Sequence, residues 1–318
     1  MRKFGLHLGI RGPVAHPDSL KTIALEAEEL GFGYLGFSDH VVIAEHGNSP
    51  YPYTASGRWF AEDTGECLEQ LTTLSYVAAA TKNIRLLTSV MVIPHRPPIL
   101  TAKMIKTIDV LSKGRITVGV GVGWMEEEIQ LLNAPPFKER GPASDEYIEA
   151  FKNLWTETSP SFVGAHVKYS GLKFFPKPVQ NPYPPLWIGG EARLARQRAG
   201  KLGDGWYPVG NNPKAPFDTP ERYGQGLREV HESAKLSGRS ASEITAGLLA
   251  IWYKLGTSDE TNMGTRRAFT GNSQEIIKDI EEYRKMGLQC LIIGGENTNL
   301  EACLKRMREF KTEIIDHL

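Results

Sequence analysis

The feature that most constrains the fold of this chain is an alternation of strand-like and helix-like segments along its whole length. Short apolar or alternating runs predict strands at 4–10, 34–37, 84–89, 116–122, 185–188, 206–208, 244–253 and 290–293. Apolar residues three and four positions apart predict helices at 20–30, 68–80, 99–111, 125–132, 145–155, 191–202, 221–237, 274–286 and 300–315. Strands that each precede a helix form parallel βαβ units, and eight such units predict a closed α/β barrel, the (β/α)8 TIM barrel.

An open sheet with a dinucleotide site is the main rival for this pattern. That fold requires a G-x-G-x-x-G turn after an early strand, where the glycines let a pyrophosphate approach the backbone. The nearest run is Gly119-Val-Gly121-Val-Gly123, which lacks the third glycine of the motif and follows the fourth strand. The closed barrel is therefore favoured.

The chain length is consistent with one domain, 1–318, because α/β barrels typically run to about 250 residues or more as a single unit. Two segments are interpreted as insertions, at 39–66 after the second strand and at 160–184 after the fourth. The first is polar and rich in glycine and proline. In the second, apolar residues on both sides of Gly164 predict a small hairpin.

Composition restricts the partners and the compartment. Lys+Arg is 37 and Asp+Glu is 37, so the net charge is zero, and neither a nucleic-acid nor an anionic-membrane partner is predicted. No apolar run approaches the length of a membrane span. Three cysteines without a C-x-x-C pair argue against a disulfide framework and favour a reducing cytoplasm.

The active site of a TIM barrel lies at the C-terminal ends of its strands, so position alone nominates residues. His40 ends the second predicted strand beside Asp39, and imidazole suits proton transfer because its pKa is nearest neutrality. Gly189-Gly190 precedes a predicted helix, where free N–H groups and the helix dipole favour an anion. Gly294-Gly295 after the eighth strand has the same form and is the rival anion site.

Several segments together resemble the luciferase-like monooxygenase family. They are GFSDHV at 36–41, RLLTSVMV at 85–92, residues 102–115, GVGVGW at 119–124, PKP at 176–178 and PLWIGG at 185–190. They occur in the family's order, and the pattern is most similar to the branch that uses the deazaflavin coenzyme F420. The resemblance implies an (α/β)8 barrel, a flavin or deazaflavin at the strand C-termini, and commonly a homodimer.

The resemblance also implies roles for residues of the second and third strands. It places His40 beside the cofactor ring as the proton donor or acceptor, and we expect Asp39 to orient the imidazole. It further implies a non-proline cis peptide between Ser89 and Val90, in a bulge that supports the ring. Non-proline cis bonds are rare and are found mostly at functional sites.

The other expected cofactor residues are mainly glycines. Gly121 and Gly123 in a strand-like run leave room for a flat ring to approach the backbone, whereas tight barrel packing explains Gly119 equally well. Gly189-Gly190-Glu191 is expected to hold the cofactor phosphate at the start of a helix.

Substrate residues are expected on the loops that follow the strands. Trp124 would wall a pocket for a flat or apolar substrate, and Tyr53 and His95 would contact it. Related deazaflavin enzymes that oxidise a sugar phosphate carry a glutamate at the position of Trp124 and a tryptophan at that of Ala44, so this activity is disfavoured. The glutamates at 126–128 are interpreted as the first turn of a helix, where carboxylates interact favourably with the dipole.

The sequence therefore predicts an oxidoreductase that transfers hydride between F420 and a small organic substrate. An FMN-dependent monooxygenase that uses molecular oxygen and a non-catalytic flavin-binding protein remain alternatives. A hydrolase with two carboxylates from Asp39, Glu191 and Glu296 is a further one. No metal site is predicted, because H-E-x-x-H is absent and the histidines lack paired ligand spacing.

Overall fold

The computed structural model describes residues 3–45, 47–59, 66–295 and 298–318. Eight parallel strands close into a barrel in the order β1-β12-β9-β8-β7-β4-β3-β2, which confirms the predicted TIM barrel. The barrel strands are β1 (Lys3–Leu8), β2 (Tyr34–Phe37), β3 (Arg85–Val92), β4 (Ile116–Gly121), β7 (Leu186–Gly189), β8 (Gly205–Tyr207), β9 (Thr245–Ala250) and β12 (Cys290–Gly294).

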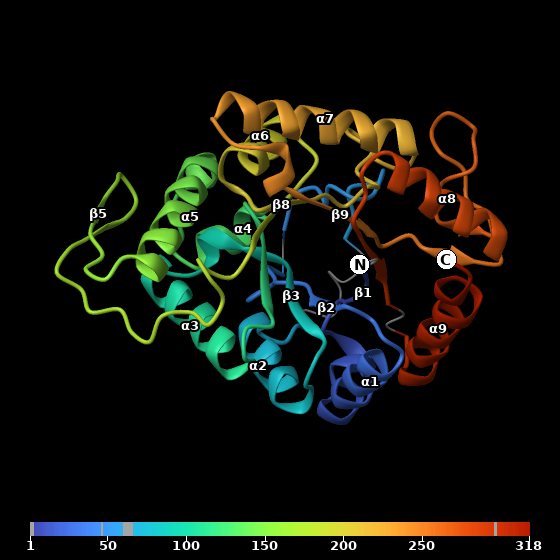
Figure 1. Cartoon of the computed structure of the whole chain (residues 1–318), viewed down its shortest axis with the longest axis horizontal. Helices are drawn as coiled ribbons and strands as arrows, with labels where there is room; N and C mark the ends of the chain where they lie inside the picture. The colour runs from blue at the N-terminus through green and yellow to red at the C-terminus, as the bar shows by residue number, and fades with distance from the viewer. Residues whose placement is uncertain (1–2, 46, 60–65, 296–297) are drawn as a thin grey trace.

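Helices surround the barrel in a ring (Figure 1). They are α1 (Pro17–Glu29), α2 (Gln70–Ala80), α3 (Pro98–Leu111), α4 (Glu126–Leu131), α5 (Arg140–Thr156), α6 (Arg193–Leu202), α7 (Pro220–Leu236), α8 (Ser273–Lys285) and α9 (Leu300–Glu313). Side-chain caps begin several of them. Glu69 accepts a hydrogen bond from the Thr72 N–H at the start of α2, and Asn272 forms a capping box with Glu275 at the start of α8.

Alternate strand residues contribute to two separate hydrophobic clusters. Leu6 and Leu8 of β1 belong to the cluster between the strands and the helices, and both are fully buried. A smaller cluster fills the barrel interior with Tyr34, Leu87, Trp187, Tyr207, Leu249, Cys290 and Ile292. Because side chains fill the interior, a ligand must bind at one end of the barrel.

The observed elements differ from the predicted ones mainly at their ends. β3 continues beyond its predicted end to Val92, and α5 begins at Arg140 instead of residue 145. The sequence pattern predicted that α6 begins at Glu191, but the helix begins at Arg193. The helix therefore starts three residues after Gly190, with Ala192 as its N-cap residue.

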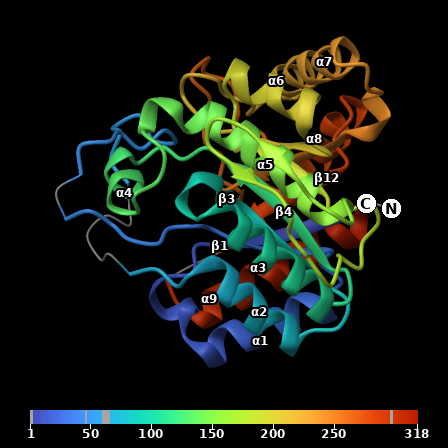
Figure 2. The same ribbon diagram turned by 90° about the vertical axis from the view of Figure 1, so that its left-hand side faces the viewer.

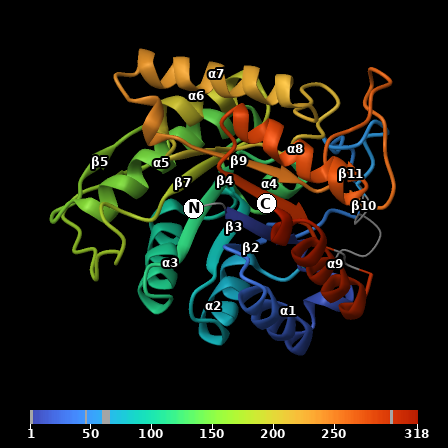
Figure 3. The same cartoon turned by 45° about the vertical axis from the view of Figure 1, so that its right-hand side comes forward.

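The second insertion contains the predicted hairpin, in which β5 (Phe162–Val163) pairs antiparallel with β6 (Lys168–Tyr169). This hairpin follows α5 and precedes β7, so it belongs to the N-terminal end of the barrel strands. A second small sheet, β10 (Lys254–Leu255) with β11 (Thr270–Gly271), was not predicted and follows β9. Figure 3 shows β5 and the β10–β11 sheet on opposite sides of the barrel.

The two ends of the barrel differ in what covers them. Figure 2 shows α4 and the segment after β2 projecting together from one end, with both chain termini at the other. Because β1 begins near the N-terminus, the covered end is the C-terminal end of the strands. Within the described ranges, no helix has the length and apolar character needed to cross a bilayer.

Candidate active site

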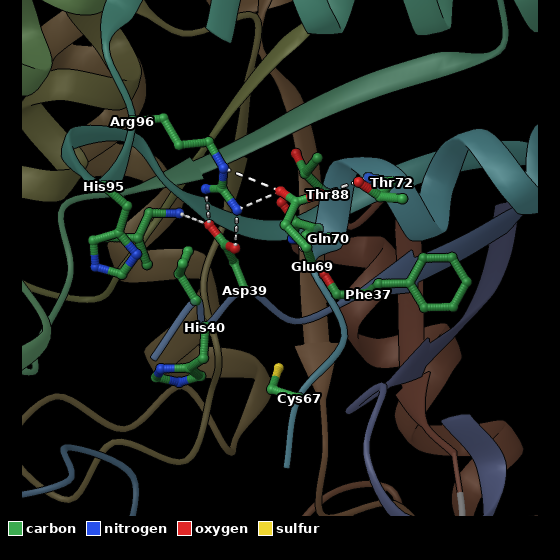
Figure 4. Close-up of polar contacts among 12 residues, drawn as sticks. Phe37, Asp39, His40, Cys67, Glu69, Gln70, Thr72, Thr88, His95 and Arg96 are labelled. Carbon is green, nitrogen blue, oxygen red and sulfur yellow. Dashed lines mark hydrogen bonds and ion pairs between the residues drawn. The ribbon is translucent and has the colours of Figure 1, made fainter. Parts of the chain in front are cut away.

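A buried ion pair fixes the end of β2. Both oxygens of Asp39 accept hydrogen bonds from the Arg96 guanidinium, at 2.7 and 2.8 Å, and one also accepts from the Val92 N–H at 2.9 Å (Figure 4). Arg96 donates further to Glu69, the N-cap residue of α2. Burial alone would raise the pKa of Asp39, but the hydrogen bonds and charge of Arg96 outweigh it and hold the pKa below its usual value.

His40 is oriented by Glu128, not by Asp39. Its Nδ1 lies 2.7 Å from Oε2 of Glu128, whereas the oxygens of Asp39 are occupied by Arg96 and Val92. The expectation that Asp39 orients the imidazole is therefore wrong, because a closer cation and a backbone N–H take up its acceptor capacity. With Nδ1–H donating to a carboxylate, the neutral imidazole carries its lone pair on Nε2.

Helix α4 also anchors the segment that follows β2. Glu128 accepts hydrogen bonds from the N–H groups of Val41 at 2.6 Å and Val42 at 3.2 Å, and Glu127 accepts from Asn48 at 2.7 Å and Ser49 at 3.2 Å. The first turn of α4 does contain these acids, as the sequence indicated. Their partners, however, are backbone groups about 80 residues earlier, and that role was not predicted.

His95 is buried near the carboxylate of Glu128. It ends a short 3-10 helix after β3, and its Nδ1 lies 3.8 Å from Oε1 of Glu128. Burial lowers the pKa of His95. Its side chain is 2% exposed, so the expected contact between His95 and a substrate is not supported by its position.

Aromatic residues pack around His40. The Trp59 ring centroid lies 4.4 Å from that of His40, and the Trp124 ring meets His40 edge-on at 6.0 Å. Tyr51 contacts both tryptophans, and Tyr53 contacts Tyr51 at 5.4 Å. The expected site residues Trp124 and Tyr53 are thus brought to the same cluster as His40, at the covered end of the barrel.

The Ser89–Val90 peptide is cis, as the resemblance implied. The pairing of β3 with β4 shifts register between Thr88 and Met91, which places Ser89 and Val90 in an irregular segment. Thr88 pairs with Phe37, the last residue of β2, so the bulge that follows Thr88 lies at the same end of the barrel as His40.

The glycines of β4 and β7 make room for this bulge. A Cβ atom on Gly121 would lie 2.8 Å from a methyl carbon of Val90, and one on Gly189 would lie 2.9 Å from the other. On Gly119 it would lie 2.2 Å from a backbone oxygen of Thr88, which supports the packing explanation for that residue. The group that approaches Gly121 and Gly189 is therefore the Val90 side chain, whereas the sequence had suggested the cofactor ring at Gly121 and the cofactor phosphate at Gly189.

Gly123 and Gly190 adopt positive φ angles of 85° and 107°, which favour glycine. The carbonyl of Gly123 accepts a hydrogen bond from Arg140 at 3.2 Å, and that of Gly190 accepts from the Trp206 indole at 3.2 Å. Both residues therefore shape turns at the ends of β4 and β7. The expected phosphate contact at Gly190 stays a prediction, without the helix start that motivated it.

Glu191 is a buried carboxyl at the end of β7. One oxygen accepts from the Val209 N–H at 2.7 Å, and the other from the Asn212 amide at 3.1 Å. Burial is the main cause that raises the pKa of Glu191 to about 7.

This raised pKa predicts a pH-dependent stability difference between the parent and Glu191→Gln. A carboxyl whose pKa is higher when folded binds its proton more tightly in the folded state, so stability falls as pH rises from about 4.5 to about 7. At pH 8 we expect Glu191→Gln to be more stable than the parent by about 1–3 kcal/mol, and therefore to melt at a higher temperature. At pH 5 we expect the variant and the parent to be about equally stable. Thermal melts at both pH values test this, and a variant destabilised equally at both would contradict it.

The two-carboxylate hydrolase is not supported by this geometry. Asp39 is held by Arg96, and each oxygen of Glu191 accepts a hydrogen bond from a backbone or amide donor. Glu296, the third candidate, lies outside the described residues. Among the described residues, no group of three or more acidic, histidine or cysteine side chains is arranged to hold a metal ion.

The comparisons with known proteins agree with the barrel fold. The fold is similar to that of the coenzyme F420 dependent tetrahydromethanopterin reductase of Methanopyrus kandleri. The similarity covers 99% of both chains, with a TM-score of 0.75 and 17% sequence identity. At this identity the likeness shows the fold alone. The family model described as luciferase-like monooxygenase matches residues 3–253.

Two curated relatives support the family at the level of sequence. The FMNH2-dependent dimethylsulfone monooxygenase of Pseudomonas putida is 34% identical over 146 residues, which are 45% of this chain and only 40% of that enzyme. An uncharacterized protein of Mycobacterium tuberculosis is 33% identical over 241 residues, or 73% of this chain and 82% of that protein. The family model over residues 3–253 and the 33% identity over most of this relative show that the chain belongs to the luciferase-like monooxygenase family and is an oxidoreductase.

Proposed function

We propose that this protein transfers hydride between coenzyme F420 and a small organic substrate at the C-terminal end of the barrel. The observation that carries the proposal is the pairing of His40 with Glu128 at 2.7 Å. A histidine held by a carboxylate through Nδ1 presents Nε2 as a proton acceptor, or as a proton donor once it is charged. Hydride exchange between carbon atoms of a cofactor and an alcohol or carbonyl substrate needs such a partner for the proton.

The residues at this end of the barrel fit a flat cofactor ring. Val90 remains partly exposed at the bulge, while Ser89 beneath it is buried. Among the described residues, Ser38 Oγ, just after β2, and Asn211 Oδ1, after β8, are buried without a hydrogen-bond partner. Because an unpartnered buried polar atom costs about 1–3 kcal/mol, these two atoms support a polar ligand at the C-terminal end of the strands.

Each part of the site has a distinct task in the proposed reaction. When bound, the deazaflavin supplies the carbon that gives or takes the hydride. His40 Nε2 takes the proton from the substrate or returns it, and the charge of Glu128 stabilises the imidazolium that forms. The aromatic rings of Tyr51, Trp59 and Trp124 exclude water from His40, which strengthens these interactions.

A second candidate function is an FMN-dependent monooxygenase. The observation that favours it is the 34% identity to a relative named as an FMNH2-dependent monooxygenase. Reduced FMN reacts readily with oxygen, whereas the deazaflavin has carbon in place of the reacting nitrogen and acts as a hydride carrier. The two candidates therefore differ in the cofactor that binds and in whether turnover consumes oxygen.

Titration of the purified protein with each cofactor tests the proposal. We expect F420 to bind with a Kd of about 10⁻⁶ M or below and FMN to bind more weakly. Tight FMN binding with no response to F420 would favour the monooxygenase, and binding of neither would overturn the proposal.

A matched pair of glycine variants shows whether the bulge carries this binding. Gly121→Ala places a Cβ 2.8 Å from a Val90 methyl carbon, whereas Gly33→Ala meets only ordinary contacts, the nearest at 3.4 Å. We expect Gly121→Ala to weaken F420 binding about tenfold and Gly33→Ala to leave it unchanged. If both variants bind F420 with equal affinity, the bulge does not contribute to cofactor binding.

A further inference from the structure

A chain of three polar side chains lies inside the barrel and is not used by the proposed reaction. His7 Nδ1 lies 3.0 Å from Ser89 Oγ, and Ser89 Oγ lies 2.9 Å from the Tyr207 hydroxyl. The three residues come from β1, β3 and β8, so the chain crosses the barrel. Ser89 is also the first residue of the cis peptide, which links this chain to the bulge.

His7 faces the barrel interior and remains accessible there. Its neighbours on β1, Leu6 and Leu8, are fully buried on the helix side, and alternation turns His7 inward. The residues paired with it on both adjacent strands are glycines, Gly36 and Gly294. His7 is partly buried as a residue, and its Nε2 is not among the buried side-chain atoms that lack a hydrogen-bond partner.

The burial of Tyr207 determines the direction of the hydrogen bonds. Its side chain is 0% exposed, and within the described part of the chain its hydroxyl has one hydrogen-bond partner, Ser89 Oγ. A buried O–H group without an acceptor is costly, so Tyr207 must donate to Ser89. Ser89 then has its own hydrogen available, and it donates to His7 Nδ1.

The tautomer of His7 follows from this order. A ring nitrogen that accepts a hydrogen bond carries no proton, so a neutral His7 bears its single proton on Nε2. The ring is neutral near pH 7 because burial, and then the nearby charge of Arg11, lower the pKa of His7 to about 3. Nε2 has no hydrogen-bond partner among the described residues, so this N–H is available to a ligand.

We infer that His7 Nε2–H is a neutral hydrogen-bond donor, fixed by Ser89 and Tyr207, for a carbonyl oxygen or ring nitrogen on the edge of the bound cofactor. The inference rests on the proposed function, because Ser89 joins this donor to the bulge that supports the ring. Ser89 and Tyr207 act as positioning residues, since they set which nitrogen of His7 carries the proton.

The direct test is ¹⁵N NMR of the histidine side chains in the parent, with His7→Gln to identify the His7 signals. We expect the shifts of Nε2 to show a protonated nitrogen and those of Nδ1 an unprotonated one at pH 7. In Tyr207→Phe the preference of the His7 proton for Nε2 over Nδ1 should disappear, because Ser89 Oγ is then free to accept a hydrogen bond from Nδ1–H. A parent His7 protonated on Nδ1 would overturn the inference.

Cofactor affinity supplies the second test. We expect His7→Leu to raise the Kd for F420 about 2–12-fold, the effect of losing one hydrogen bond, and His7→Gln to raise it less because its amide can also donate. If the parent binds F420 and His7→Leu binds it equally well, this inference fails while the proposed function stands. If the parent binds neither F420 nor FMN, the proposed function fails, and the role of His7 fails with it.

Discussion

Replacement of His40 with alanine is expected to lower turnover by about 10²–10⁴, the usual contribution of general acid–base catalysis. The expectation rests on the geometry of His40, whose Nδ1 lies 2.7 Å from Glu128 and whose ring packs against Trp59. Asparagine at position 40 should recover little, because an amide does not carry a proton at neutral pH. Affinity for the cofactor should fall much less, since the Ser89–Val90 bulge contributes most of the proposed ring contacts.

Glu128→Gln separates the orientation of His40 from its presence. The amide oxygen can still accept from Val41 and Val42, but the amide nitrogen then faces His40 Nδ1. Nδ1 must become an acceptor, which moves the proton of the neutral imidazole to Nε2, the wrong atom for a base. We expect Glu128→Gln to lower turnover by about 10² or more and to keep nearly the parent's melting temperature.

Full turnover in the His40→Ala variant would contradict the catalytic role of His40 and leave this histidine with a structural role only.

Arg96→Met is expected to destabilise the fold by about 3–5 kcal/mol, because it leaves the buried carboxylate of Asp39 without its cation. The Asp39 side chain is 0% exposed, and its pKa lies below the usual value as a result of Arg96. For a carboxyl with a lowered pKa, the stabilisation is present at neutral pH and is lost as the pH falls through the folded pKa. Urea unfolding at pH 7 and in acid measures both effects.

Two controls identify the cause of that loss. Asp39→Asn combined with Arg96→Met removes both charges and should recover part of the stability. Lys305→Met breaks an exposed pair with Glu309, 3.7 Å apart, and should cost about 0.5 kcal/mol or less. A loss below about 1 kcal/mol for Arg96→Met would show that the ion pair does not anchor the end of β2.

The barrel and the position of His40 could be predicted because both depend on local pattern. Strand and helix periodicity determines the alternation, and a residue just after a predicted strand must lie at the C-terminal end of the barrel. Asp39 and His40 were found in this way. The cis peptide at Ser89 was found only through resemblance to the family, and the structure confirms it.

The partners of these residues could not be predicted, because they are distant in sequence. Glu128 is 88 residues from His40, and a run of three acids fits the first turn of a helix equally well. Arg96 follows His95 directly after the third strand, but its pairing with Asp39 was not predicted. The available signal for this ion pair was the position of Arg96. It follows the third strand, which neighbours the strand that ends before Asp39.

The role of the glycines was misread for a different reason. A glycine in a strand shows that something approaches the backbone closely, but it does not say what. For Gly121 and Gly189 the approaching group is the Val90 side chain of a neighbouring strand. Pattern alone does not distinguish that from a ligand.

The crystal structure of the protein with bound F420 tests the central claim most directly. We predict that the cofactor ring lies against the Ser89–Val90 bulge, with its hydride-carrying carbon facing His40 Nε2. A ring bound elsewhere, such as the groove of about 430 Å³ lined by Arg228, His231 and Lys285 near the start of β9, would contradict it.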